Sequence, residues 1–80
     1  MTPQKARELA ALSLEMVAPN IDTARVGWDA DLREDLGLDS LDFLSFVEGL
    51  SDESGLRIEE DDYPELFTLN GCVAYLTRQA

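Results

Sequence analysis

Apolar residues in the first quarter of the chain recur at the spacing of a helix. Thr2 followed by Pro3 is typical of an N-cap and a first helical residue, and Pro19-Asn20 is a stop signal. We therefore expect a helix that begins at Pro3 and ends before Pro19. Its expected core-facing positions are Ala6, Leu9, Leu12 or Ser13, Met16 and Val17.

A second amphipathic helix is expected from about Ser40 to Glu53, where Ser54-Gly55 would end it. Side chains advance by about 100° per helical residue, which divides this segment into two faces. The apolar face consists of Phe43, Phe46, Val47 and Leu50, with Leu41 and Leu44 on its flanks. The polar face consists of Asp42, Ser45, Glu48, Gly49, Asp52 and Glu53. We expect the apolar face to pack on the rest of the domain.

The remaining segments are a long connection and two shorter helices. Residues 21–38 have the composition of a loop but carry scattered apolar side chains, so we expect an ordered loop with one helical turn near residues 30–35. Residues 62–67 are predicted to form a short, turn-like helix. Thr68 is the candidate cap of a last helix, which should bury Cys72, Val73 and Leu76 and partly cover Tyr75.

These elements predict an all-α fold. A chain of 80 residues supports one small domain, here residues 1–80. The element order predicts a small four-helix bundle, with a long ordered loop between helices 1 and 2 and a short third helix. The isolated alternation in "LRI" is too short to indicate a strand.

The chain is strongly acidic. It contains 17 Asp and Glu residues against 6 Lys and Arg residues, which gives a formal net charge of −11. Such a polyanion repels the phosphates of nucleic acids and attracts basic protein surfaces. We therefore expect a monomer that binds basic proteins and does not bind nucleic acid.

The cysteine and histidine content and the hydropathy pattern argue against disulfide-bonded, zinc-binding, secreted and membrane-spanning proteins. Cys72 is the single cysteine and the chain has no histidine, so an intramolecular disulfide and a zinc site of Cys and His ligands are both excluded. The N-terminal residues lack the pattern of a signal peptide, and no apolar segment reaches the length of a membrane span. We expect a cytoplasmic location, in a reducing compartment, without membrane insertion.

Ser40 lies between two carboxylates in the sequence "LGLDSLDFL", where the loop meets the second helix. A serine nucleophile needs a nearby base, but the chain has no histidine, a single lysine (Lys5) and no G-x-S-x-G motif, which argues against a hydrolase. A calcium-binding EF-hand loop starting at Asp29 fails at three required positions, which hold Arg33, Glu34 and Ser40.

The start of the second helix supports two compatible roles. Asp39 can cap the helix, with Asp42 three residues later in the position of a capping-box acid. A hydroxyl in the first turn lies beside free backbone N–H groups and the positive end of the helix dipole, which favour an anion attached to its oxygen. Ser40 is therefore a candidate site for attachment of a phosphodiester.

The run "DLGLDSLDFLSFVEGL" resembles the acyl carrier protein family, in which L-G-x-D-S-L surrounds the attachment serine. The resemblance extends over roughly the whole chain. "IDTARVGWDADLRED" is similar to the family's long first loop, and the spacing from "LGLDSL" through "RIEEDD" to "TLNGCVAYL" is similar to that of its second, third and fourth helices. Ser45, Glu48 and Ser54 depart from residues common in the family, which leaves the pathway and the partner enzymes open.

The resemblance implies a carrier and not an enzyme. Ser40 would receive 4′-phosphopantetheine from coenzyme A through a phosphopantetheinyl transferase. The thiol of this arm would hold acyl intermediates of fatty-acid, polyketide or specialised lipid synthesis as thioesters. Asp39 and Leu41 would flank the attachment site and contact partner enzymes. The residues that match the family's acyl pocket are Val47, Leu50, Leu66 and Cys72.

An acidic stripe, defined as Asp42, Glu48, Asp52 and Glu53, follows Ser40 along the second helix. It would present the arm to acyl-processing enzymes through their basic docking patches. A solvated helix face also explains the polarity of the stripe, but not its near absence of cations. Two alternatives stay open, namely an aminoacyl or peptidyl carrier and an unmodified acidic adaptor that binds basic proteins.

Overall fold

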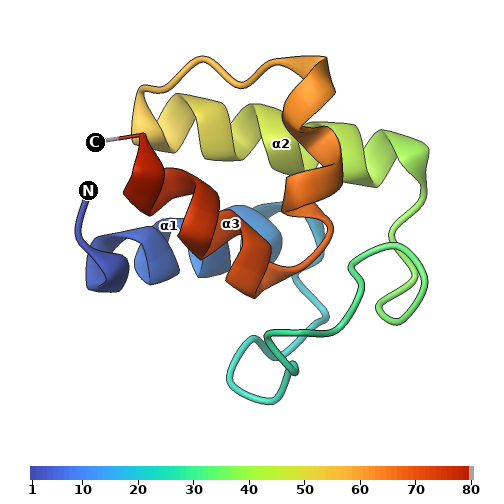
Figure 1. Ribbon diagram of the computed structural model, residues 1–80. Coiled ribbons are helices and arrows are strands. Elements are labelled where there is room, and N and C mark those ends of the chain that lie inside the picture. The colour runs from blue at the N-terminus through green and yellow to red at the C-terminus, as the bar shows by residue number, and fades with distance from the viewer. Residues whose placement is uncertain (80) are drawn as a thin grey trace.

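The computed structural model describes residues 1–79, and these form an all-helical fold without a β-strand. Figure 1 shows the four elements, which are α1 (Pro3–Val17), α2 (Ser40–Ser54), the 3-10 helix η1 (Glu60–Leu66) and α3 (Leu69–Arg78). The predicted fold class, with a long first loop and a short third helical element, is confirmed. Within residues 1–79, no helix has the length and apolar character needed to cross a membrane.

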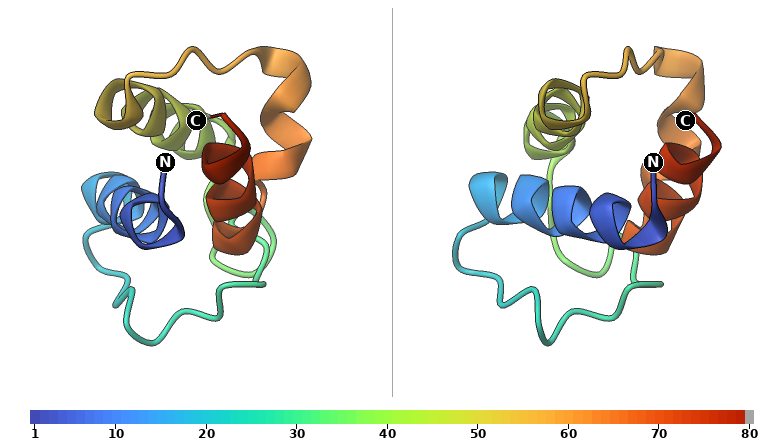
Figure 2. Two further views of the ribbon diagram at one scale, coloured as in Figure 1. Left: turned by 60° about the vertical axis from the view of Figure 1, so that its left-hand side comes forward. Right: turned by 90° about the vertical axis from the view of Figure 1, so that its left-hand side faces the viewer.

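The three α-helices enclose one core. Helix α1 packs against both α2 and α3, and η1 packs against α3. In Figure 1, α1 and α2 run in opposite directions, because the chain returns through the long loop of residues 18–39. In both views of Figure 2 this loop lies below the helices, while the segment between α2 and η1 lies above them. Since this loop leads directly into Ser40, its path sets the position in space at which α2 begins.

Local capping explains where the helices begin and end. The Thr2 hydroxyl oxygen accepts the N–H of Lys5 at 3.2 Å, and the Thr68 oxygen accepts the N–H of Gly71 at 2.9 Å. Helix α2 ends at Ser54, one residue beyond the predicted end, because Gly55 adopts the left-handed conformation at φ +72°. Both predicted threonine caps are confirmed.

The predicted apolar face of α2 is confirmed, since Phe43, Phe46, Val47 and Leu50 are buried. Three expectations elsewhere need correction. In α1 Ser13 is the buried one of the two open alternatives, Leu12 and Ser13, but Met16, expected to face the core, is 61% exposed because it lies at the edge of the buried stripe. In α3 Tyr75 is buried, whereas Val73 is only half-buried. The third correction concerns Gly49, expected on the polar face; it is half-buried because α1 crosses α2 there.

The long loop is ordered, as predicted, and it contains one helical turn in which the N–H of Asp35 donates to the carbonyl of Asp31 at 2.9 Å. Leu32 is fully buried and its N–H donates to the Phe67 carbonyl at 2.8 Å. The Asn70 N–H donates to the carbonyl of Trp28 at 2.9 Å. These bonds attach the loop to the junction between η1 and α3.

Two titratable groups in α3 are buried and neutral. Burial raises the pKa of the Cys72 thiol to about 12, so it remains protonated at neutral pH. Burial and then a 2.9 Å hydrogen bond to the Asp62 carboxylate raise the pKa of Tyr75 to about 12. Because only the thiolate is a strong nucleophile or metal ligand, Cys72 is a packing residue in this structure.

Ser13 is the one buried side-chain oxygen or nitrogen in residues 1–79 that has no hydrogen-bond partner. A β-carbon built at Gly49 would lie 4.0 Å from its Oγ, so the hydroxyl faces the contact between α1 and α2. A buried polar group without a partner costs about 1–3 kcal/mol. The contact between the two helices is therefore less stable than an apolar contact of the same shape.

We predict that Ser13→Ala stabilises the domain, by about 1 kcal/mol or more, because it removes this desolvation cost. The melting temperature should rise by about 4–8 °C per kcal/mol. Ser45→Ala, at an exposed position of α2, is the matched control for the gain in helix propensity alone, which is about 0.5 kcal/mol. Equal stabilisation by the two variants would show that the Ser13 hydroxyl costs nothing.

Candidate functional site

Ser40 is the first residue of α2 and its side chain is exposed. Two features of the preceding residues place it there. Gly37 adopts φ +78°, a left-handed conformation that a residue with a β-carbon reaches only with strain. Asp39 is extended, and its Oδ1 accepts the N–H of Asp42 at 2.8 Å, which confirms the predicted cap. The hydroxyl therefore lies at a defined helix start.

The surroundings of Ser40 combine attraction and repulsion for an anion. The first N–H groups of a helix have no partner within the helix, and they carry the positive end of its dipole. This favours a phosphate group on the Ser40 oxygen. The carboxylates of Asp39 and Asp42 lie one and two residues away and oppose it. A cation near Ser40 would shift this balance toward binding of the phosphate group.

A hollow of about 380 Å³ adjoins Ser40. It is lined by Arg33, Ser40, Phe43, Leu44, Glu60, Tyr63, Pro64 and Phe67. The ring of Phe43 meets those of Tyr63 and Phe67 edge-on, with centroids 6.1 Å and 5.3 Å apart. We refer to Phe43, Tyr63 and Phe67 as the aromatic cluster. It brings α2 and η1 together with the residue that follows η1, beside the serine.

Arg33, Tyr63 and Phe67 were not among the predicted site residues. Arg33 lies on the helical turn of the long loop, and its guanidinium carbon is 5.7 Å from the centroid of the Phe67 ring. The aromatic pair in "YPELF" was the only sequence signal for this part of the hollow. No local pattern predicts that a loop arginine, 34 positions before Phe67, lies against that ring.

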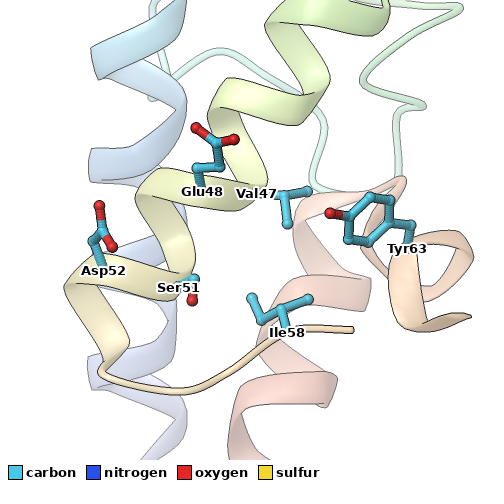
Figure 3. A pocket seen from close by; sticks show the side chains of 6 residues that line it. All are labelled: Val47, Glu48, Ser51, Asp52, Ile58 and Tyr63. Carbon is cyan, nitrogen blue, oxygen red and sulfur yellow. The ribbon is translucent and has the colours of Figure 1, made fainter. Parts of the chain in front are cut away.

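A second hollow, of about 260 Å³, lies further along α2. In Figure 3, Val47, Ile58 and Tyr63 point toward a common space, whereas Glu48 and Asp52 point away from it. The Ser51 hydroxyl, also at this hollow, donates to the Leu56 carbonyl. Tyr63 lines both hollows, so it separates the space beside Ser40 from this one.

The residues predicted to contact partners all lie on α2 or at its cap. Their side chains are exposed, and Leu41 has 75% of its surface accessible. The set consists of Asp39, Leu41, Asp42, Glu48, Asp52 and Glu53. The structure thus presents an exposed leucine beside Ser40, followed by the acidic stripe along one helix.

The residues predicted to line an acyl pocket lie in the core. Val47, Leu50, Leu66 and Cys72 are each at most 2% exposed, and of these only Val47 lines either hollow. The space open beside Ser40 is lined instead by the aromatic cluster and by Arg33. An acyl chain would reach Leu50, Leu66 and Cys72 only after the core rearranged, whereas Val47 already borders the second hollow.

Comparison with known proteins agrees with this geometry. The family model described as "Phosphopantetheine attachment site" matches residues 7–76. The chain belongs to this family. An acyl carrier protein from Saccharopolyspora erythraea is 44% identical over 57 residues, which are 71% of this chain and 59% of that protein. The chain therefore aligns with less than two thirds of that relative's length. The predicted resemblance to acyl carrier proteins is confirmed.

A solved structure of an acyl carrier protein from Enterococcus faecalis supports the fold. It superposes with a TM-score of 0.77 at 24% identity and covers 100% of both chains. The long loop and the short third helix thus belong to an arrangement found in an acyl carrier protein. Acyl carrier proteins are carriers and not enzymes.

The cofactor of this family member is 4′-phosphopantetheine, as its family indicates. Residues at the start of α2 fit that group. Ser40 offers an exposed hydroxyl for a phosphodiester, and the first turn of the helix favours the negative charge. The adjoining hollow provides apolar surface for the rest of the arm.

We predict that Asp39→Ala destabilises the domain by about 1 kcal/mol, because the N–H of Asp42 loses its acceptor. Asp39→Asn keeps a side-chain oxygen at the same place and should retain most of the stability. Urea unfolding of the two variants and the wild type measures both effects. If the alanine and asparagine variants unfold at the same urea concentration, the cap does not stabilise α2.

Proposed function

We propose that the chain is an acyl carrier protein that holds acyl intermediates as thioesters on a 4′-phosphopantetheine arm attached to Ser40. One observation carries the proposal: the serine of "LGLDSL" is exposed at the first position of α2, beside a hollow, in a chain whose family match spans residues 7–76. In this function residues 1–80 act as a single carrier domain.

Ser40 is the nucleophile when the arm is attached. Its oxygen forms a bond to phosphorus, a P–O bond of the coenzyme A pyrophosphate breaks, and adenosine 3′,5′-bisphosphate leaves. The serine proton passes to a base of the phosphopantetheinyl transferase, because this chain has no histidine to accept it. The thiol of the attached arm supplies the thioester linkage. The chain itself contributes position and recognition.

Partner enzymes would dock on α2. Leu41 offers an exposed apolar contact next to Ser40, and the acidic stripe continues from it along α2. Interfaces of this kind pair an apolar centre with complementary charges at the rim. We propose that the phosphopantetheinyl transferase and the acyl-processing enzymes bind Asp39, Leu41 and the acidic stripe through basic patches.

The acyl cargo, the cellular location and the oligomeric state are also proposed. We propose acyl chains of fatty-acid, polyketide or specialised lipid synthesis, carried by a cytoplasmic monomer. Loading would require the core around Val47, Leu50, Leu66 and Cys72 to open if the chain is to be buried. An unmodified acidic adaptor is the second candidate, because the exposed acidic stripe would also bind basic proteins without any arm.

We predict that the chain gains the mass of one phosphopantetheine group when it is incubated with coenzyme A and a broad-specificity transferase. Ser40→Ala should abolish the gain and leave the helical circular dichroism unchanged, because only an exposed hydroxyl is lost. Ser45→Ala, five residues along α2, is the control and should be modified like the wild type. If Ser40→Ala is modified, or if the wild type is not modified, Ser40 is excluded as the attachment site.

We also predict that charge reversal on the stripe slows modification. Asp42→Lys with Glu48→Lys should reduce the rate by about tenfold at low ionic strength, because steering by opposite charges accelerates association. The reduction should shrink at physiological salt, where exposed charges are screened over about 8 Å. Glu8→Lys with Glu15→Lys makes the same change in net charge on α1. Equal rates for the two double variants would contradict docking through the stripe.

A further inference from the structure

We propose that Arg33 binds the phosphodiester that joins the arm to Ser40, an inference that rests on the proposed function. The two residues line the same hollow, although they come from different elements. Arg33 belongs to the helical turn of the long loop, and Ser40 begins α2. The fold therefore places a permanent cation at the same hollow as the oxygen that would carry the phosphate.

Two acids of the loop turn, Asp31 and Asp35, accept backbone N–H groups, whereas Glu60 lines the same hollow as Arg33. Asp31 Oδ1 accepts the N–H groups of Arg33 and Glu34 at 2.8 and 2.9 Å, and Asp35 Oδ2 accepts the N–H of Asp31 at 2.8 Å. No carboxylate within residues 1–79 lies within 4.0 Å of the Arg33 guanidinium. In a chain of net charge −11, this guanidinium is left without an ion pair in the described part.

The cation–π contact of Arg33 with Phe67 leaves its hydrogen-bond donors available. Its guanidinium lies over the face of Phe67, 5.7 Å from the ring centroid. A guanidinium held near a ring by cation–π attraction keeps N–H groups that match the oxygens of a phosphate. The contact with Phe67 thus orients Arg33 and does not occupy it.

Other cations do not compete for this role in the described part of the chain. Arg25, Arg57 and Arg78 pair with Asp22, Glu59 and Glu65, respectively. Lys5 and Arg7 lie on α1, and neither lines the hollow beside Ser40. Attachment of the arm adds a negative charge next to Asp39 and Asp42, in a hollow that Glu60 also lines, and Arg33 is the cation among the lining residues that can offset it.

Bound in this way, the arm would leave Ser40 across the aromatic cluster instead of pointing into solvent. Arg33 is a positioning residue here, since it touches the phosphodiester and not the reacting thiol. Binding should therefore show itself in the stability and spectra of the modified protein, independently of any partner enzyme.

Arg33→Gln and Arg7→Gln, which remove one exposed cation each, test the inference. For each variant and the wild type, the melting temperature is measured before and after Ser40 is modified, at low ionic strength. The gain on modification should be smaller by about 1–5 °C in Arg33→Gln than in the wild type, as for loss of one exposed ion pair. Arg7→Gln should show the gain of the wild type. Because Arg33→Gln lacks the Phe67 contact both before and after modification, subtracting the two melting temperatures of this variant cancels the effect of losing that contact.

Nuclear magnetic resonance of the arginine side chains gives a second readout. The Nε–Hε signal of Arg33, assigned by its absence in Arg33→Gln, should move when Ser40 is modified, while that of Arg7 should not. An unmoved Arg33 signal in protein that has gained the arm's mass overturns this inference alone, as does an equal thermal gain in all three proteins. Failure to gain the mass overturns the proposed function as well.

Discussion

The backbone hydrogen bond from Leu32 to Phe67 is the contact on which the arrangement around Ser40 depends. It joins the long loop to the residue that follows η1, and the fully buried Leu32 side chain anchors it in the core. The bond from Asn70 to Trp28 reinforces it. Because the loop also determines where α2 starts, these bonds bring Arg33, Phe67 and Ser40 to one hollow. If the loop moved freely, Ser40 would still begin α2, but Arg33 would not be held at the hollow beside it.

Charge acts differently at long and short range in this domain. The net charge of −11 produces a field that attracts basic proteins from a distance and weakens the compact state. At short range, acids near Ser40 act through directed bonds: Asp39 caps α2, and Asp31 and Asp35 cap the loop turn. The loop acids thereby leave Arg33 unpaired, whereas the acidic stripe remains free for partners.

The small core limits where an attached chain can go. The four residues predicted for an acyl pocket are buried in the core. Opening that core would expose apolar surface of residues that are at most 2% exposed, at about 25 cal/mol per Å². The surface hollow beside Ser40 offers apolar contact without this cost. The two sites therefore differ in the rearrangement they require of the protein.

The sequence by itself determined the helices, their caps and the buried face of α2, because these depend on the spacing of neighbouring residues. It also determined that Ser40 follows the cap Asp39 and that the acidic stripe lies along the same helix. It did not determine that Ser13 is buried in place of Leu12, or that Gly49 faces α1, because these depend on how two helices cross. Arg33 and Phe67 meet only in the folded chain, since the hydrogen bonds that join the loop to η1 and α3 link residues far apart in sequence.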